Sequence, residues 1–357
     1  MKFVSKETIS DIAPYKAGEG NIFDSEVIKL SSNENPFGCS PKAKSAFLDV
    51  AKYLNRYPEG SSNDLRAAIA ENLAINKDHI TCANGSDEIF NLLIAAFTEA
   101  GDEIIYSEHG FLMYKFYALV NSVNPIAAKE TDLKANINNI LAQVTNKTKL
   151  VFIANPNNPT GTYLTKSELE ELRIKLPDNV ILVVDGAYAE YVTQDEYENG
   201  FDLVAKYSNV VATRTFSKIY GLASLRVGYC YASSEITEVL NKVRGPFNVN
   251  LAAQLAACAA VEDNGFCDMS RDHNNKWLKI FKTEFKEIGV DFVDSVGNFF
   301  LLKLNVVEID KYVGFLNEHK IKIRKVAAYG LPEYIRISVG TNEENNKLLE
   351  LSKQFWL

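Results

Sequence analysis

The sequence contains few cysteines, no long apolar run and no excess of positive charge. Its five cysteines include no Cys-x-x-Cys pair, which argues against a disulfide framework or a zinc ribbon and favours a reducing cytoplasm. No stretch approaches the ~18 uninterrupted apolar residues of a membrane span, and residues 1–14 lack the apolar core of a secretion signal. With 38 basic and 46 acidic residues, the formal net charge of −8 excludes a general nucleic-acid binder. We therefore expect neither a membrane nor a nucleic-acid partner.

Several common catalytic signatures are also missing. The chain has no Rossmann glycine fingerprint, no Walker A loop, no His-Glu-x-x-His pair and no Gly-x-Ser-x-Gly elbow. Its four histidines are scattered without ligand spacing, so we expect structural roles for them and no metal site. Chemistry based on a dinucleotide, a P-loop, zinc or an esterase-type serine is not favoured.

The chain has the length and the apolar content of a globular enzyme. Its 357 residues correspond to about two domains, at a soft prior of ~150 residues each, and 46% of them are hydrophobic. Amphipathic segments, one of which opens with a capping box of Thr165 and Glu168, alternate with short apolar runs. Those runs, typical of strands buried on both faces, lie at 104–106, 150–154, 180–185, 210–215 and 227–232. The alternation predicts an α/β fold with a mostly parallel sheet.

The pattern changes after residues 244–246. An apolar-periodic helix is expected around 251–261 and a charged helix around 276–288, and strands at 299–304 and 335–339 predict an α+β arrangement. The predicted division is an N-terminal arm over 1–40 that packs with the small domain, a large cofactor-binding domain over 41–245 and a small domain over 246–357.

The most informative motif is the segment 215–221, Thr-Phe-Ser-Lys-Ile-Tyr-Gly, which is followed by Arg226. It places Lys218 just beyond an apolar strand, among hydroxyls and glycine. A lysine whose pKa is lowered by partial burial and nearby cations can hold an aldehyde cofactor as a Schiff base. A solvated surface lysine is the plain alternative, and the surroundings of Lys218 argue against it.

Asp185 ends the apolar run 180–184, so its carboxylate is expected at the carboxyl edge of a buried strand, where open α/β sheets bind ligands. Burial of this charge requires a cationic partner or raises the pKa. A protonated pyridine nitrogen is one candidate partner. A loop-capping Asp, or one paired with a nearby Arg, is an equally good reading of this residue alone.

Two further segments are candidate ligand-binding loops, and the first of them follows the predicted strand at 150–154. The segment 155–161, Asn-Pro-Asn-Asn-Pro-Thr-Gly, presents Asn158 as a donor suited to a phenolate oxygen, although the same residues also build ordinary turns. The segment 84–88, Asn-Gly-Ser-Asp-Glu, precedes a helix whose N-terminus can bind a phosphate. A plain N-cap by Ser86 or Asp87 is the alternative there, and both readings can hold together.

Three further residues are candidates for contacts with a ligand. Phe111 follows the strand at 104–106 and could stack on a flat ring, although an aromatic group of this kind is more often core. Arg336 lies inside an apolar strand pattern and requires an anion, either a protein carboxylate or a substrate group. Arg324 is a second candidate of this kind, and a solvated edge strand is its alternative.

In their order along the chain, these motifs resemble the pyridoxal-phosphate-dependent aminotransferases of fold type I, class I and II, and within them the histidinol-phosphate aminotransferase family. The resemblance covers almost the whole chain and implies a large domain with a mostly parallel seven-stranded sheet and a smaller α+β domain. The motifs that carry it lie at 32–36, 56–58, 84–88, 155–161, 185–188, 215–228 and 334–341.

The resemblance also implies roles for individual residues. Lys218 would form the Schiff base and move the reaction's proton, while Asp185 would keep the pyridine nitrogen protonated. Asn158 and Tyr188 would hydrogen-bond the 3′ oxygen, and Phe111 would stack on the ring. The other residues near the cofactor would be Gly85, Ser86, Asp87, Thr215, Ser217 and Arg226, with Tyr57 from the neighbouring subunit of a homodimer. The substrate would be bound by Tyr15, Asn33, Arg324 and Arg336.

The activity that the resemblance implies is amino transfer between histidinol phosphate and 2-oxoglutarate, in histidine biosynthesis. The same scaffold serves aromatic amino acids and small phosphorylated ketones such as triose phosphates, and it also serves pyridoxal-phosphate-dependent decarboxylases of phospho-amino acids. The cofactor motifs do not separate these alternatives. A catalytically dead binding protein would lack Lys218 or Asp185, and both are present.

Overall fold

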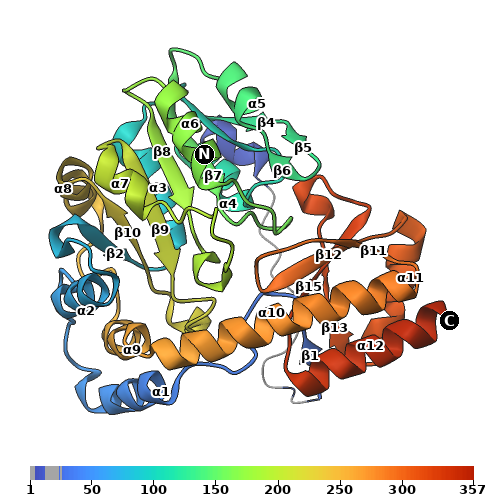
Figure 1. Cartoon of the computed structure of the whole chain (residues 1–357). Coiled ribbons are helices and arrows are strands. Elements are labelled where there is room, and N and C mark those ends of the chain that lie inside the picture. The colour runs from blue at the N-terminus through green and yellow to red at the C-terminus, as the bar shows by residue number, and fades with distance from the viewer. Residues whose placement is uncertain (1–4, 13–23, 25) are drawn as a thin grey trace, which may run out of the picture.

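The fold is built on two separate β-sheets, each with its own hydrophobic cluster. The computed structural model describes residues 5–12, 24 and 26–357. Figure 1 shows the two sheets side by side, with the helix α10 running from one part to the other. We call the part around the seven-stranded sheet the large domain and the part around the four-stranded sheet the small domain.

The sheet of the large domain has the strand order β2-β10-β9-β8-β7-β3-β4. All neighbours in it are parallel except β10, which is antiparallel to both β2 and β9. Its strands are β2 (Ile80–Ala83), β3 (Glu103–Ser107), β4 (Asn124–Ala128), β7 (Thr148–Ala154), β8 (Ile181–Asp185), β9 (Val210–Thr215) and β10 (Gly228–Ala232). The seven-stranded, mostly parallel sheet is confirmed, and so are the five strands predicted within it. The two edge strands, β2 and β4, were not predicted from sequence.

Helices cover both faces of this sheet, because the strand side chains alternate between two apolar clusters. On one face lie α3 (Ser86–Phe97), α4 (Leu112–Val120) and α8 (Ser234–Val243). The other face is covered by α2 (Asn63–Leu73), α5 (Ile137–Ala142), α6 (Lys166–Lys175), α7 (Phe201–Lys206) and α9 (Leu251–Val261). The helix α1 (Pro41–Leu48) packs on α9.

The small domain has an antiparallel sheet in the order β11-β12-β15-β14. Its strands are β11 (Asp291–Val293), β12 (Phe299–Lys303), β14 (Arg324–Lys325) and β15 (Tyr334–Ser338). The long helices are α10 (Asn264–Glu287), α11 (Val306–Glu318) and α12 (Asn342–Trp356). The helix expected around 276–288 begins twelve residues earlier, at Asn264, because buried Cys267, Ser270 and Asn274 continue its inner face.

The N-terminal segment adds to the small domain. Strand β1 (Ile28–Lys29) pairs in parallel with β13 (Ile321–Lys322). The helix α9, in contrast, contributes to the core of the large domain. The division of the chain at 40 and 245 stays a prediction. The short 3-10 helices are η1 (Glu7–Asp11), η2 (Asp49–Tyr53), η3 (Lys77–His79), η4 (Ala189–Tyr191), η5 (Ala223–Leu225) and η6 (Ala327–Tyr329).

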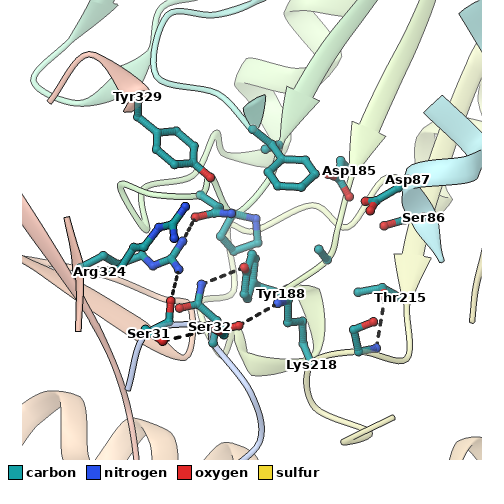
Figure 2. A pocket seen from close by; sticks show the side chains of 18 of the residues that line it. Ser31, Ser32, Ser86, Asp87, Asp185, Tyr188, Thr215, Lys218, Arg324 and Tyr329 are labelled. Atoms are coloured by element: carbon teal, nitrogen blue, oxygen red, sulfur yellow. Dashed lines mark hydrogen bonds between the residues drawn. The ribbon is translucent and has the colours of Figure 1, made fainter. Parts of the chain in front are cut away.

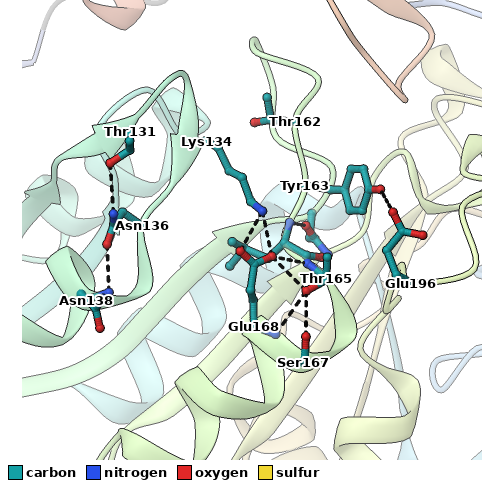
Figure 3. Close-up of polar contacts among 12 residues, drawn as sticks. Thr131, Lys134, Asn136, Asn138, Thr162, Tyr163, Thr165, Ser167, Glu168 and Glu196 are labelled. Carbon is teal, nitrogen blue, oxygen red and sulfur yellow. Dashed lines mark hydrogen bonds and ion pairs between the residues drawn. The ribbon is translucent and has the colours of Figure 1, made fainter.

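The start of α6 is fixed as its sequence predicts. Thr165 accepts a hydrogen bond from the backbone of Glu168, whose carboxylate accepts one from the backbone of Thr165 at 2.7 Å. Figure 3 shows Lys134 reaching this same carboxylate, at 2.7 Å, from the hairpin of β5 (Glu130–Thr131) and β6 (Lys134–Ala135). Thr162 donates to the carbonyl of Leu133 in this hairpin. The hairpin therefore supports the loop that ends in Gly161.

Within the described residues, no helix combines the length and the apolarity that a membrane span requires.

Candidate active site

A cavity of about 340 Å³ lies at the carboxyl ends of the central strands and is closed on its other side by the small domain (Figure 2). This is the position where open α/β sheets bind ligands. It brings together thirteen of the residues predicted from sequence: Asn33, Ser86, Asp87, Phe111, Asn158, Asp185, Tyr188, Thr215, Ser217, Lys218, Arg226, Arg324 and Arg336.

Lys218 reaches the cavity from the loop that follows β9. Its amine donates a hydrogen bond to the carbonyl of Ser32 at 3.3 Å and lies 5.6 Å from the centre of the Tyr188 ring. Burial, together with the positive charge of Arg336, lowers the pKa of Lys218 to about 8. An amine of this kind is unprotonated in part near neutral pH and can react with a carbonyl group.

Asp185 ends β8 and is 4% exposed. Burial raises the pKa of its carboxyl to about 6, against the effect of two hydroxyl groups that donate to it. Tyr114 donates to one oxygen at 2.7 Å and Thr213 donates to the other at 3.0 Å. No ion pair to Asp185 is formed by any residue of the described chain, so the pairing with an Arg that its sequence left open does not occur. The carboxylate can therefore pair with a cationic group of a ligand in the cavity.

A third group of side chains surrounds the start of α3. The N-cap is Gly85, with φ 83° and no side-chain cap, so the reading of Ser86 or Asp87 as a plain N-cap was wrong. Arg226 donates to Ser217 at 3.1 Å and lies 3.6 Å from the carboxylate of Asp87. A Cβ on Gly85 would come within 2.5 Å of the Arg226 guanidinium, so only glycine permits this approach. Helix amides, hydroxyls and a guanidinium together form an anion site.

At the opposite end of the cavity, Arg336 is buried, and no carboxylate of the described residues forms an ion pair with it. It donates to the Asn158 side chain at 2.5 Å and to the Ser31 carbonyl at 2.9 Å. Its Nε atom is buried and has no partner among the described residues. Arg324 lies directly opposite Arg336 in the pairing of β14 with β15. Two adjacent guanidinium groups can bind a carboxylate or a phosphate.

The N-terminal segment holds part of this end in place. Asn33 donates from its side chain to the Tyr188 hydroxyl at 2.9 Å, and its backbone N–H donates to Ser338 at 2.8 Å. Asn33 is 1% exposed and has a φ of 54°, which Asn tolerates better than most residues. Burial raises the pKa of Tyr188 to about 12, although Arg336 and the Asn33 hydrogen bond both act to lower it.

The comparison with known proteins follows from these features. The family model for aminotransferase class I and II matches residues 25–351. The chain is 43% identical over 360 residues to the histidinol-phosphate aminotransferase of Rhodopseudomonas palustris (strain HaA2), covering 99% of this chain and 98% of that protein. The chain belongs to the histidinol-phosphate aminotransferase family. It is also 44% identical over 355 residues to the family member from Nitrobacter winogradskyi, covering 97% and 96% of the two chains.

Solved structures agree with this family assignment. The histidinol-phosphate aminotransferase of Sinorhizobium meliloti, crystallised in complex with pyridoxal-5'-phosphate, superposes with a TM-score of 0.87 at 25% identity, covering 92% of this chain and 90% of that chain. The L-threonine-O-3-phosphate decarboxylase of Porphyromonas gingivalis shares the fold, with a TM-score of 0.77 at 22% identity and coverage of 92% and 99%. The predicted fold, family and aminotransferase activity are confirmed.

Gly85 and Tyr57, both predicted to belong to the site, are not among the residues that line the cavity of this chain. Tyr57 is 83% exposed and stacks on Phe247 elsewhere on the surface. Tyr15 lies outside the described residues. Conversely, sequence reasoning missed Tyr114, Thr213 and Tyr329. Thr213 lies two positions before Thr215 on β9, so strand alternation could have placed both on the cavity side.

The residues of this cavity fit pyridoxal phosphate. Lys218 supplies a reactive amine, Asp185 a buried carboxylate that lacks a cationic partner in the described chain, and the start of α3 an anion site. These three features match, in the same order, the aldehyde, the ring nitrogen and the phosphate of the cofactor.

We expect the Lys218 amine of the cofactor-free enzyme to react with acetic anhydride with a midpoint near pH 8, because the amine reacts only when unprotonated and burial disfavours its charge. Since the ordinary pKa of 10.5 applies to the unfolded chain, charged Lys218 also opposes folding below about pH 8, and this cost disappears as the pH rises toward 10.5. Arg336→Met should raise the midpoint. Competitive labelling with mass spectrometry measures it, and a wild-type midpoint near 10.5 would contradict the assignment.

Proposed function

We propose that the chain catalyses pyridoxal-phosphate-dependent amino transfer between histidinol phosphate and 2-oxoglutarate. The observation that supports this most strongly is the placement of Lys218 between a buried carboxylate, Asp185, and a pair of arginines, Arg324 and Arg336. The first part of this arrangement suits the cofactor and the second suits an anionic substrate. The chain has five free cysteines, three of them buried, which supports a reducing cytoplasmic location.

The cofactor would be held at three points. Ser86, Asp87, Ser217 and Arg226, with Gly85 and Thr215 beside them, would surround its phosphate. Phe111 would stack on the ring, while Asn158 and Tyr188 would hydrogen-bond the ring oxygen. When bound, the cofactor supplies an aldehyde that takes up the amino group and a ring that accepts an electron pair from the substrate carbon.

Asp185 and Lys218 would act on protons at defined atoms. With its pKa raised to about 6, Asp185 is still ionised at neutral pH and can hold a proton on a ring nitrogen. Tyr114 and Thr213 each donate a hydrogen bond to one of its two oxygens, so the orientation of the carboxylate is fixed. Lys218, with a pKa of about 8, can both accept and return a proton near neutral pH.

Substrate binding would use the arginine end of the cavity. Arg336 keeps one buried N–H without a partner among the described residues, and that donor can be satisfied by an anion. With Arg324 beside it, the site can take the phosphate of histidinol phosphate in one half-reaction and a carboxylate of glutamate in the other. Asn33 orients Tyr188 between the two ends, and Tyr15 would complete the substrate site.

We propose further that the enzyme is a homodimer. Tyr57 belongs to an exposed apolar patch that also includes Tyr53, Leu54 and Phe247. The exposed fractions of these four side chains range from 42% at Phe247 to 83% at Tyr57. Large exposed apolar side chains in one patch mark an interface. A second copy of the chain would cover them, and Tyr57 would then reach the cofactor phosphate of its neighbour.

Asp185→Asn should keep the shape of the site and remove its charge. Loss of one partner from a buried charge pair costs roughly 3 to 5 kcal/mol, which corresponds to a loss of at least about a hundredfold in amino-transfer rate. Borohydride reduction and peptide mapping should still label Lys218 in this variant. Near-normal turnover would refute the role of Asp185, and label on another lysine would refute that of Lys218.

Arg336→Ala should impair both half-reactions, and Arg324→Ala should affect histidinol phosphate more than glutamate. Each lost charge-assisted contact costs about 1.5 to 3 kcal/mol, or roughly ten- to a hundredfold in kcat/KM. Stopped-flow absorbance of the bound cofactor, with each amino donor added separately, measures this.

The same measurement separates the alternatives. Faster conversion with phenylalanine or tyrosine would favour an aromatic aminotransferase, and reaction only with a phosphorylated three-carbon amine would favour a triose-phosphate substrate. Release of carbon dioxide from a phospho-amino acid would identify a decarboxylase.

The dimer is tested by mixing two inactive variants, Lys218→Ala and Tyr57→Ala, under conditions in which subunits exchange. A mixed dimer contains one complete site if Tyr57 acts across the interface, so activity should rise well above the sum of the separate variants. Sedimentation gives the mass of each species. A monomeric wild-type enzyme, or a mixture without recovered activity, would overturn the proposal.

A further inference from the structure

One side of the cavity is formed by a short segment of the small domain that lies on the large domain. This segment runs from Val326 through η6 to Leu331. Val326, Tyr329 and Leu331 form an apolar cluster with Leu301, and Leu112 of the large domain packs against it. The segment is therefore a contact between the two domains at the edge of the site.

A histidine of the large domain makes a polar contact with this segment. The Nδ1 atom of His109 lies 2.7 Å from the backbone carbonyl of Tyr329. A carbonyl oxygen only accepts hydrogen bonds, so Nδ1 must carry the hydrogen. A Cβ built on Gly330 would lie 3.5 Å from the His109 ring, so the imidazole also packs closely against the next residue.

His109 is itself held firmly by the large domain. Its backbone N–H donates to the carboxylate of Glu130 at 3.2 Å, and the hydroxyl of Ser107 donates to the same oxygen at 2.6 Å. The turn closes with a hydrogen bond from the Gly110 N–H to the Ser107 carbonyl at 2.7 Å. Two residues after His109, Phe111 lines the cavity. The histidine thus projects from a fixed turn toward the small domain.

The contact affects the site through Tyr329. Its side chain lines the cavity and is 7% exposed. Figure 2 shows its hydroxyl pointing into the cavity from the side where Arg324 lies, which is opposite the side of Asp185 and Asp87. This is the side that would receive the substrate beyond its reacting carbon. Where the Tyr329 backbone lies decides how far the ring extends over that space.

We propose that His109 is a positioning residue, which holds Tyr329 of the small domain over the substrate side of the cavity through the hydrogen bond between Nδ1 and the Tyr329 carbonyl. The aromatic ring of Tyr329 then forms a wall against the body of the substrate. The choice of histidinol phosphate as the probe rests on the proposed function, whereas the contact between the domains does not.

The test compares His109→Ala with His109→Asn, because the Asn amide nitrogen can stand where Nδ1 stands and still donate. His109→Ala should raise KM for histidinol phosphate about three- to tenfold, as expected for one lost neutral hydrogen bond, with kcat changed less than twofold. His109→Asn should restore KM to within about twofold of the wild type. The absorbance of the bound cofactor should be the same in all three proteins.

Two controls separate positioning from a general loss of structure. His319→Ala removes a histidine whose Nδ1 bonds only to Phe315 of its own helix, and it should leave KM unchanged. Tyr329→Ala should raise KM as His109→Ala does, and the double variant should be no worse than Tyr329→Ala alone.

Three outcomes would overturn the proposal: an unchanged KM in His109→Ala, an Asn variant as impaired as the Ala variant, or additive effects in the double variant. If the wild type does not convert histidinol phosphate, the proposed function fails on its own. The same comparison, made with the amine that the wild type does convert, then still decides the role of His109.

Discussion

Most features of the site follow from one constraint, which is the burial of charged groups around a single cavity. Asp185 lies at the end of a fully buried strand, where water cannot stabilise its carboxylate, and Lys218 has an amine that burial likewise disfavours in its charged form. The first pKa is raised to about 6 and the second is lowered to about 8. Both groups are thereby brought toward neutral pH from opposite directions. Asp185 remains negatively charged at neutral pH in spite of burial, while burial makes Lys218 a group that can exchange a proton in the same cavity.

The fold turns this constraint into geometry by giving each charge a different support. The parallel strands of the large domain end at one edge and deliver Asp185 and the Lys218 loop to it. The small domain delivers Arg324 and Arg336 from a separate antiparallel sheet. Hydroxyl groups of Tyr114 and Thr213, rather than cations, hold the Asp185 carboxylate. A cation there would neutralise the charge that the proposed contact with the cofactor's ring nitrogen requires.

Sequence reasoning recovered the elements whose signals are local. Apolar runs located the central strands, and the capping box placed the start of α6 at Thr165. Motif residues such as Lys218 could be assigned because a lysine beyond a buried strand is unusual. The partners of those residues were harder to predict, since Tyr114 and the His109 contact with Tyr329 depend on segments that meet only after folding. For Asp185 the sequence left open a pyridine nitrogen, a nearby Arg or a loop cap, and it did not predict the two hydroxyls, 71 and 28 positions away, that donate to the carboxylate.

The segment from Ile28 to Asn35 links early and late parts of the chain. Its strand pairs with β13, Asn33 bonds to both Tyr188 and Ser338, and Asn35 donates to the carbonyl of Ile219. Every one of these partners is synthesised well after the segment itself. During translation this stretch therefore lacks its strand partner until the ribosome has synthesised β13, at residues 321–322. The completed site is among the last features that a growing chain can acquire, so truncated products carry no assembled substrate end.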